Sequence, residues 1–171
     1  MFSIHFYGCD REGVKPTIGK AEIGEIPLQQ SWQSTITFSD SGKTRAIVQA
    51  GRIRVFESRL ETVLDSLVQI DFFDAEEIRT TKLNSHWGKV DDKSRDLYAY
   101  ENVVVKNVDG VTLTTEKLMW RNIDRKITTD EFVTIVTPTE KIEGYGFESD
   151  QGLKNYTIFK ITYITQASTL Q

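Results

Sequence analysis

Short runs of alternating apolar and polar residues, separated by turn signals, follow one another along most of this chain. Apolar side chains recur at every second position through most of residues 32–38 and 68–72, and at Phe159, Ile161 and Tyr163 within residues 155–164. Side chains two apart lie on the same face of a strand, so this period of two predicts β-strands. Their close and even spacing predicts an all-β protein of roughly ten to fourteen short antiparallel strands, in a sandwich, jellyroll or barrel.

The clearest hairpin is predicted for residues 102–120, where a run of valines ends at Asp109-Gly110 and a second apolar run follows. Asp-Gly between two such runs is a strong turn signal. Part of the second run has the form apolar–x–small–x–x–apolar, and this form recurs in copies that begin at Val48, Ile78, Leu113 and Ile142. A step of three changes the face of a strand, so each copy predicts a strand interrupted by a bulge or corner. A long sheet that bends repeatedly in this way can curl around its own apolar face.

One segment favours two structures. In residues 59–67, Leu60, Val63, Leu64 and Leu67 have the i, i+3, i+4, i+7 spacing of a helix, whereas the neighbours on both sides alternate like strands. A short helix is therefore the alternative to a strand at this point only.

The two ends of the chain differ from its middle. Residues 1–30 are expected to form a leader and tether, residues 31–164 the β domain, and residues 165–171 a tail. The chain is apolar up to Gly8 and polar after Cys9, which resembles the end of a bacterial lipoprotein signal. We therefore predict lipidation of Cys9, with an incidental thiol in a frayed tail as the alternative. No stretch approaches the roughly 20 apolar residues of a membrane span.

Composition and charge reduce the range of functions. The net charge is −4 and no basic stripe interleaves with aromatic residues, which argues against a nucleic-acid partner. The single cysteine allows no intramolecular disulfide. The histidines and the acidic pairs Glu76-Glu77 and Asp91-Asp92 are isolated, and neither a nucleophile elbow nor a phosphate-binding glycine loop is present. We expect no catalytic residues, no metal and no cofactor.

Bulky apolar side chains are instead spread over many predicted strands. Most of them must form the core, but a curled sheet can also hold the alkyl chains of a ligand between its walls. The candidate groove residues are Ile36, Phe38, Val48, Ile70, Ile78, Leu83, Leu113, Leu118, Trp120, Val133, Ile135, Ile142, Phe147 and Ile158.

Residues 44–164 resemble the LptC family of lipopolysaccharide export proteins, which belongs to the OstA-like β-jellyroll superfamily. The matching stretches are 70–77 (IDFFDAEE), 79–105, 109–135 (DGVTLTTEKLMWRNIDRKITTDEFVTI) and 142–161 (IEGYGFESDQGLKNYTIFKI). The resemblance implies a curled β-jellyroll that holds lipopolysaccharide acyl chains. It implies that the chains pass from an inner-membrane ABC transporter to a periplasmic bridge protein of the same, LptA-like fold.

The resemblance also implies a periplasmic location with the N-terminus anchored to the inner membrane. Many members of the family carry a transmembrane helix, which this sequence lacks, and a lipid on Cys9 would take its place. One acyl chain binds a membrane only marginally, so a second contact, from the transporter, is expected.

The final predicted strand, residues 155–164, is expected at a sheet edge, where unpaired backbone groups can receive a strand of a partner. Its candidate docking residues are Tyr156, Ile158, Phe159, Ile161 and Tyr163. Two alternatives to a lipid relay stay open. One is a structural adaptor with a sealed core, and the other is a β-sandwich glycan hydrolase with two carboxylates about 5 to 10 Å apart.

Overall fold

The computed structural model describes residues 26–166, and most of these residues lie in strands. The strands are β1 (Gln29–Asp40), β2 (Lys43–Phe56), β3 (Glu61–Asp65), β4 (Val68–Phe73), β5 (Arg79–Ser85), β6 (Trp87–Asp91), β7 (Leu97–Asn107), β8 (Thr112–Arg121), β9 (Lys126–Val136), β10 (Glu140–Asp150) and β11 (Tyr156–Gln166). Within this part of the chain the only helical element is the short 3-10 turn η1 (Glu57–Arg59). These residues therefore contain no helix long and apolar enough to cross a membrane. The all-β prediction is confirmed.

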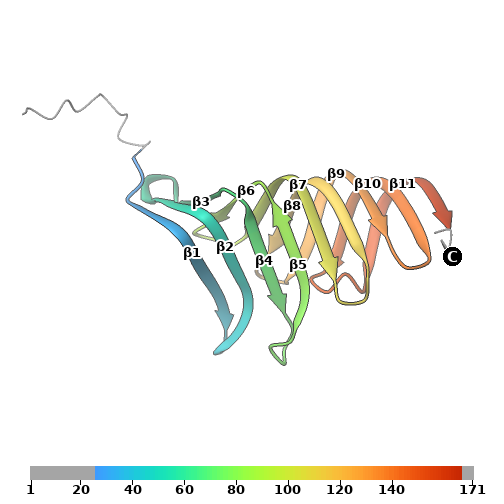
Figure 1. Cartoon of the computed structure of the whole chain (residues 1–171), viewed down its shortest axis with the longest axis horizontal. Coiled ribbons are helices and arrows are strands. Elements are labelled where there is room, and N and C mark those ends of the chain that lie inside the picture. Colours follow the sequence, from blue (N-terminus) through green and yellow to red (C-terminus); the bar gives the residue numbers. More distant parts are fainter. Residues whose placement is uncertain (1–25, 167–171) are drawn as a thin grey trace, which may run out of the picture.

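All eleven strands belong to one antiparallel sheet with the order β11-β10-β9-β8-β7-β5-β4-β2-β3-β6. β1 pairs with β2, and β6 also pairs with β7. Figure 1 shows the strands running from β1 at one end of the molecule to β11 at the other. Within residues 26–166, β1 pairs only with β2 and β11 only with β10, so this part of the sheet has an open edge at each end.

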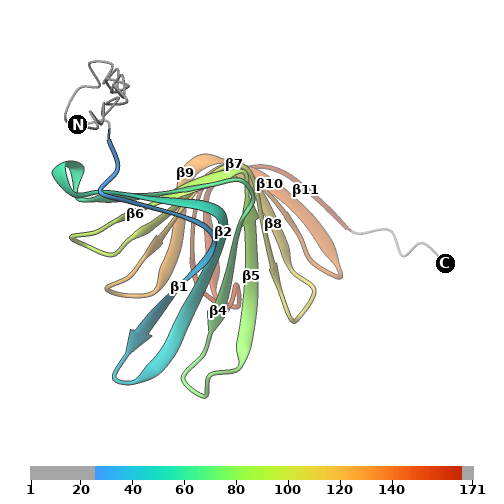
Figure 2. The ribbon, with the colours of Figure 1, turned by 60° about the vertical axis from the view of Figure 1, so that its left-hand side comes forward.

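The sheet bends sharply along one line, which divides it into two walls (Figure 2). β2 pairs with β4 through residues 46–49 and with β3 through residues 52–56, so the bend crosses this strand near Gly51. The register shifts between Tyr100 and Val103 of β7, and the residues between them, Glu101 and Asn102, have left-handed backbone conformations. We call this bend the line of corners. It passes through or beside five evenly spaced positions of the chain, which are 86, 101, 116, 131 and 146.

The corners explain the repeated motif. In the copies that begin at Val48, Leu113 and Ile142, all three motif positions are buried, because a bulge or corner between the second and third returns the side chain to the inner face. The copy at Ile78 does not follow this pattern, so the predicted corner is wrong there. Ile78 precedes β5 in the β4–β5 turn and its side chain is 63% exposed, so it does not point between the walls.

Residues 59–67 form strand β3 and its flanking turns, so the helical alternative is wrong. Only Leu64 of the apolar set is buried. Leu60 and Leu67 are exposed in left-handed conformations at the two ends of β3. The i, i+3, i+4, i+7 spacing arises here because Leu60 and Leu67 lie in the two turns that flank β3, one strand length apart. The four apolar residues therefore do not share one face of a helix.

The boundaries of the expected domain, residues 31–164, stay a prediction, although strand structure extends slightly further, from Gln29 to Gln166. Cys9 lies outside the described residues.

Candidate functional site

The inner faces of the two walls meet in one apolar core, and this is where most of the groove candidates lie. The aromatic centre is Trp120, whose ring packs edge-on against Phe38 with a centroid distance of 6.0 Å. It packs in a tilted arrangement against Phe72 with a centroid distance of 5.6 Å. Ile142 is buried between β9 and β11. Nine further candidates are buried in this core: Val48, Ile70, Leu83, Leu113, Leu118, Trp120, Val133, Ile135 and Phe147.

Three candidates remain partly accessible and pack against the core from its ends. Ile36 and Phe38 lie on β1, and Ile158 lies on β11. The structure thus brings together all the groove candidates except Ile78.

The long side opposite the corners is bridged in the C-terminal half of the molecule. The β10–β11 loop, residues 151–155, extends from one wall to the other: the Gln151 side-chain amide donates to the Phe73 carbonyl at 2.6 Å, and the Asn107 amide donates to the Gly152 carbonyl at 3.0 Å. Between these contacts Leu153 is buried in the core. This loop covers the interior beneath β4, β5 and β7.

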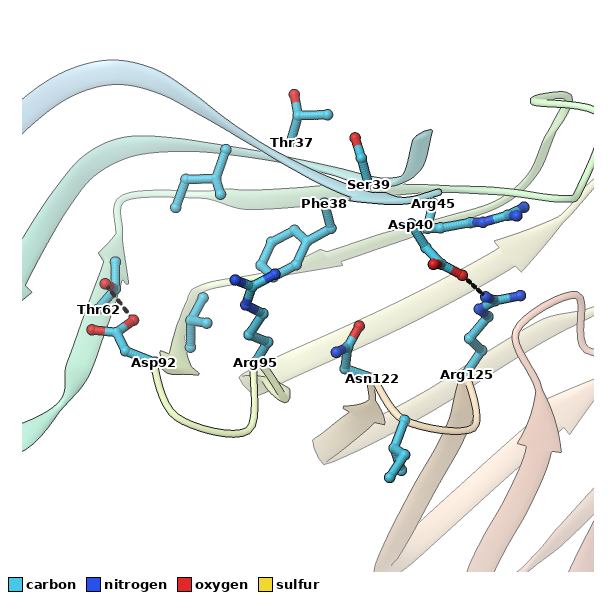
Figure 3. A pocket seen from close by; sticks show the side chains of 13 residues that line it. Thr37, Phe38, Ser39, Asp40, Arg45, Thr62, Asp92, Arg95, Asn122 and Arg125 are labelled. Carbon is cyan, nitrogen blue, oxygen red and sulfur yellow. Dashed lines mark hydrogen bonds and ion pairs between the residues drawn. The ribbon is translucent and has the colours of Figure 1, made fainter. Parts of the chain in front are cut away.

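Nearer to β1 the interior opens through a cavity of about 640 Å³, which we call the mouth. Its apolar part is formed by Ile36, Phe38 and Val90, and Phe38 connects it to the Trp120 core. Mostly polar residues from β1, β2, β3, the β6–β7 segment and the β8–β9 loop complete it, and Figure 3 labels all of them except Ile123: Thr37, Ser39, Asp40, Arg45, Thr62, Asp92, Arg95, Asn122, Ile123 and Arg125.

Polar contacts fix the rim of the mouth. Arg125 forms an ion pair with Asp40, which links the β8–β9 loop to the end of β1. The Thr62 hydroxyl donates to the Asp92 carboxylate at 2.9 Å. Arg45 donates from Nη1 to the Asp74 carbonyl at 2.8 Å.

The opposite end of the molecule is the free edge of β11. Of the docking candidates, Phe159, Ile161 and Tyr163 are more than half exposed. Tyr156 and Ile158 are partly buried, and the Tyr156 ring stacks on Phe147 at 6.0 Å. Burial raises the pKa of Tyr156, so its phenol stays neutral at physiological pH. The expectation of an edge position for this strand is confirmed.

The acidic pairs noted in the sequence support turns. The Asp91 carboxylate accepts the backbone N–H groups of Lys93 and Ser94 at 2.9 Å, and the bond from Ser94 is the main cause that lowers the pKa of Asp91. Glu77 accepts the Thr44 N–H at 2.8 Å, which lowers the pKa of Glu77 in the same way. Over residues 26–166, no group of three or more His, Cys, Asp or Glu side chains is arranged to hold a metal ion.

Charged side chains also hold the ends of β8, β9 and β10 together. Arg121 donates to Asp124 at 2.8 Å and to Glu148 at 3.4 Å, and Lys126 forms an ion pair with Glu148. The bond from Lys126 is the main cause that lowers the pKa of Glu148, and the bond from Arg121 does the same for Asp124.

This cluster predicts a loss of stability in acid. Because the pKa values of Glu148 and Asp124 are lower in the folded chain, both carboxylates contribute stability above their ordinary values of 4.5 and 3.8, and this contribution is lost as the pH falls through the folded values. Urea unfolding followed between about pH 6 and about pH 3 should show the parent losing stability more steeply than Glu148→Gln. Equal slopes for the two proteins would show that Glu148 contributes nothing to this loss.

The sequence did not reveal the mouth. Arg45, Arg95 and Arg125 are separated by many residues, lie in different segments, and form no basic run. No periodic pattern marks them: Arg95 and Arg125 lie in turns, whose residues have no fixed inward or outward position, and Arg45 lies on a separate strand, β2. Ile164, exposed on β11 beside the docking candidates, was also missed.

These features define a class of protein, the bent, single-sheet β-jellyroll. It has an apolar interior, a mouth beside one terminal strand and two open edges. The family described as "Lipopolysaccharide-assembly, LptC-related" matches residues 15–162. The chain therefore belongs to the LptC-related family and has a role in lipopolysaccharide transport, as a component of machinery of the periplasm and inner membrane. A comparison with individually curated proteins gave no match.

Proposed function

We propose that this protein relays lipopolysaccharide by holding its acyl chains between the two walls of the sheet. The observation that carries the proposal is the continuity between the mouth and the core. Phe38 lines the mouth and also packs on Trp120, so an alkyl chain that enters beside Phe38 reaches the apolar interior without crossing a polar layer.

The energetics favour a groove that is only partly preformed. Each buried methylene group of a lipid contributes roughly 0.8 kcal/mol, so complete burial of several chains would prevent release to the next protein. Trp120 and Phe147 are fully buried. The partly exposed residues Ile36 and Phe38 therefore make the first contacts, and deeper entry requires the walls to separate.

The open edges supply the path in and out. We propose that β11 receives the first strand of the periplasmic bridge protein of the same fold, which extends one apolar interior across two chains. The inner-membrane ABC transporter would deliver the lipid at the other end, near β1. Anchoring at the inner membrane through a lipid on Cys9 belongs to the same proposal, and Cys9 lies outside residues 26–166.

Photocrosslinking tests the relay. A photoreactive residue at Phe38, in membranes supplied with ATP and the transporter, should capture lipopolysaccharide, because this position joins the mouth to the core. The same residue at Trp120 or Phe147 should capture it only if the walls separate. The control is Lys106, which is exposed on β7. Capture at Lys106 alone would contradict a groove.

One observation favours a structural adaptor as the second candidate function. The core is closely packed and Leu153 covers it from the β10–β11 loop, so a permanently sealed interior would leave only the edges to act. An adaptor predicts partner binding through β11 with no lipid captured at Phe38. Asp91 and Glu77 give the hydrolase alternative no comparable support, because their carboxylates accept backbone N–H groups and so support local structure.

A further inference from the structure

The mouth combines an aromatic floor with three arginines, although the protein as a whole is acidic. Arg45 comes from β2, Arg95 from the β6–β7 segment and Arg125 from the β8–β9 loop. With Asp40 and Asp92 also in the lining, three positive charges face two negative ones, and the side-chain charge of the mouth is +1, against −4 for the chain.

We infer that the mouth binds a phosphoryl group of the lipid headgroup while the attached alkyl chains lie on Phe38. The inference rests on the proposed function, since it names the headgroup chemistry that the same opening recognises. An arginine guanidinium presents its donors in a planar fork that matches two oxygens of a phosphoryl group, and such charge-assisted bonds are stronger than neutral ones.

Donors for this purpose are available in two of the arginines. The Nε of Arg45 is buried and has no hydrogen-bond partner among the described residues, while its Nη1 is held by the Asp74 carbonyl. A buried donor without a partner costs free energy, and a ligand oxygen would remove this cost. The side chain of Arg95 makes no ion pair or hydrogen bond within residues 26–166, and it lines the mouth together with Phe38 (Figure 3).

The third arginine is already paired, and this pairing has a consequence for release. Arg125 is bound to Asp40. The second carboxylate, Asp92, is occupied by the Thr62 hydroxyl on the other side of the mouth. An entering phosphoryl group would compete with Asp40 for Arg125, so Asp40 lowers the affinity for the headgroup and allows a carrier to pass it on.

The test compares the binding of two forms of one lipid to the full chain. The probes are fluorescently labelled rough lipopolysaccharide and the same preparation after chemical removal of its phosphoryl groups. The parent should bind the phosphorylated form about tenfold more tightly, as expected for the loss of charge-assisted hydrogen bonds. The variant with Arg95→Gln and Arg125→Gln keeps only Arg45 and should lose most of this preference, and Asp40→Asn should widen the difference. Arg45 is not substituted, because it also supports the β4–β5 turn through Asp74.

The control variant is Arg79→Gln, which removes an exposed arginine of β5 that pairs with Asp71 away from the mouth. It should keep the parent's preference. Equal binding of the two lipid forms by the parent would overturn the inference while leaving the lipid relay intact. Failure of the parent to bind either form would overturn the proposed function itself. Inorganic phosphate that displaces the labelled lipid at equal concentration would show a site for free phosphate and would likewise overturn the assignment to a lipid headgroup.

Discussion

Lysine at both Phe159 and Ile161 should abolish high-affinity binding to the periplasmic bridge protein. Both side chains are exposed on β11, whose only partner strand in the described part of the chain is β10. Charges on an edge strand prevent the addition of another strand, because the incoming strand would have to desolvate them without an opposite charge. We expect the affinity to fall by about 100-fold or more, equivalent to about 2.7 kcal/mol, in titrations of the purified proteins.

The matched control places the same substitutions on an interior strand. Phe132 and Val136 are exposed hydrophobic residues of β9, which is paired on both sides. Phe132→Lys with Val136→Lys should leave partner binding within about twofold of the parent, as surface changes away from an interface do. If the β11 variant keeps its thermal transition and still binds as tightly as the parent, β11 is not the docking edge.

Trp120→Ala should cause the largest loss of stability of any single substitution in the core. The Trp120 side chain is 1% exposed and packs on Phe38 from β1 and Phe72 from β4, so it ties together strands that are far apart in the chain. Removing a buried tryptophan eliminates its transfer free energy and leaves a cavity, which together cost about 3 to 5 kcal/mol. Urea unfolding followed by circular dichroism measures this loss.

A second tryptophan provides the control for this experiment. Trp32 lies on β1, two-thirds exposed, so Trp32→Ala should cost about 0.5 kcal/mol or less. A loss below about 1 kcal/mol for Trp120→Ala would mean that the walls close over the missing side chain. The interior would then be compliant, and the relay would need no separate opening step.

The local pattern of the sequence determined the strands and most of their turns. Alternation at 32–38 and 68–72 predicted β1 and β4, and Asp109-Gly110 predicted the turn between β7 and β8. In that turn Gly110 has a φ of +86°, and the Asn107 side chain accepts two backbone N–H groups. These features follow from short-range physics, because side-chain alternation and turn conformation depend on a few neighbouring residues.

The interruption of that alternation also carried information about the fold. The step of three in the motif copies predicted that strands would bend and bring the next apolar side chain back to the inner face. The copies at Val48, Leu113 and Ile142 do so at the line of corners. A parity change is visible in sequence because burial on one face must be kept on both sides of a corner.

Only the tertiary structure decided how the walls come together and what lies at their opening. The helical spacing of Leu60 to Leu67 and the motif copy at Ile78 were local patterns without a common face, and pairing with distant strands determined their outcome. The mouth required Arg45, Arg95 and Arg125 to converge from separate loops and strands. A period of two determines the face of a strand residue, but no such period governs the turns that hold Arg95 and Arg125. Their convergence with Arg45 of β2 therefore follows from the bend of the whole sheet.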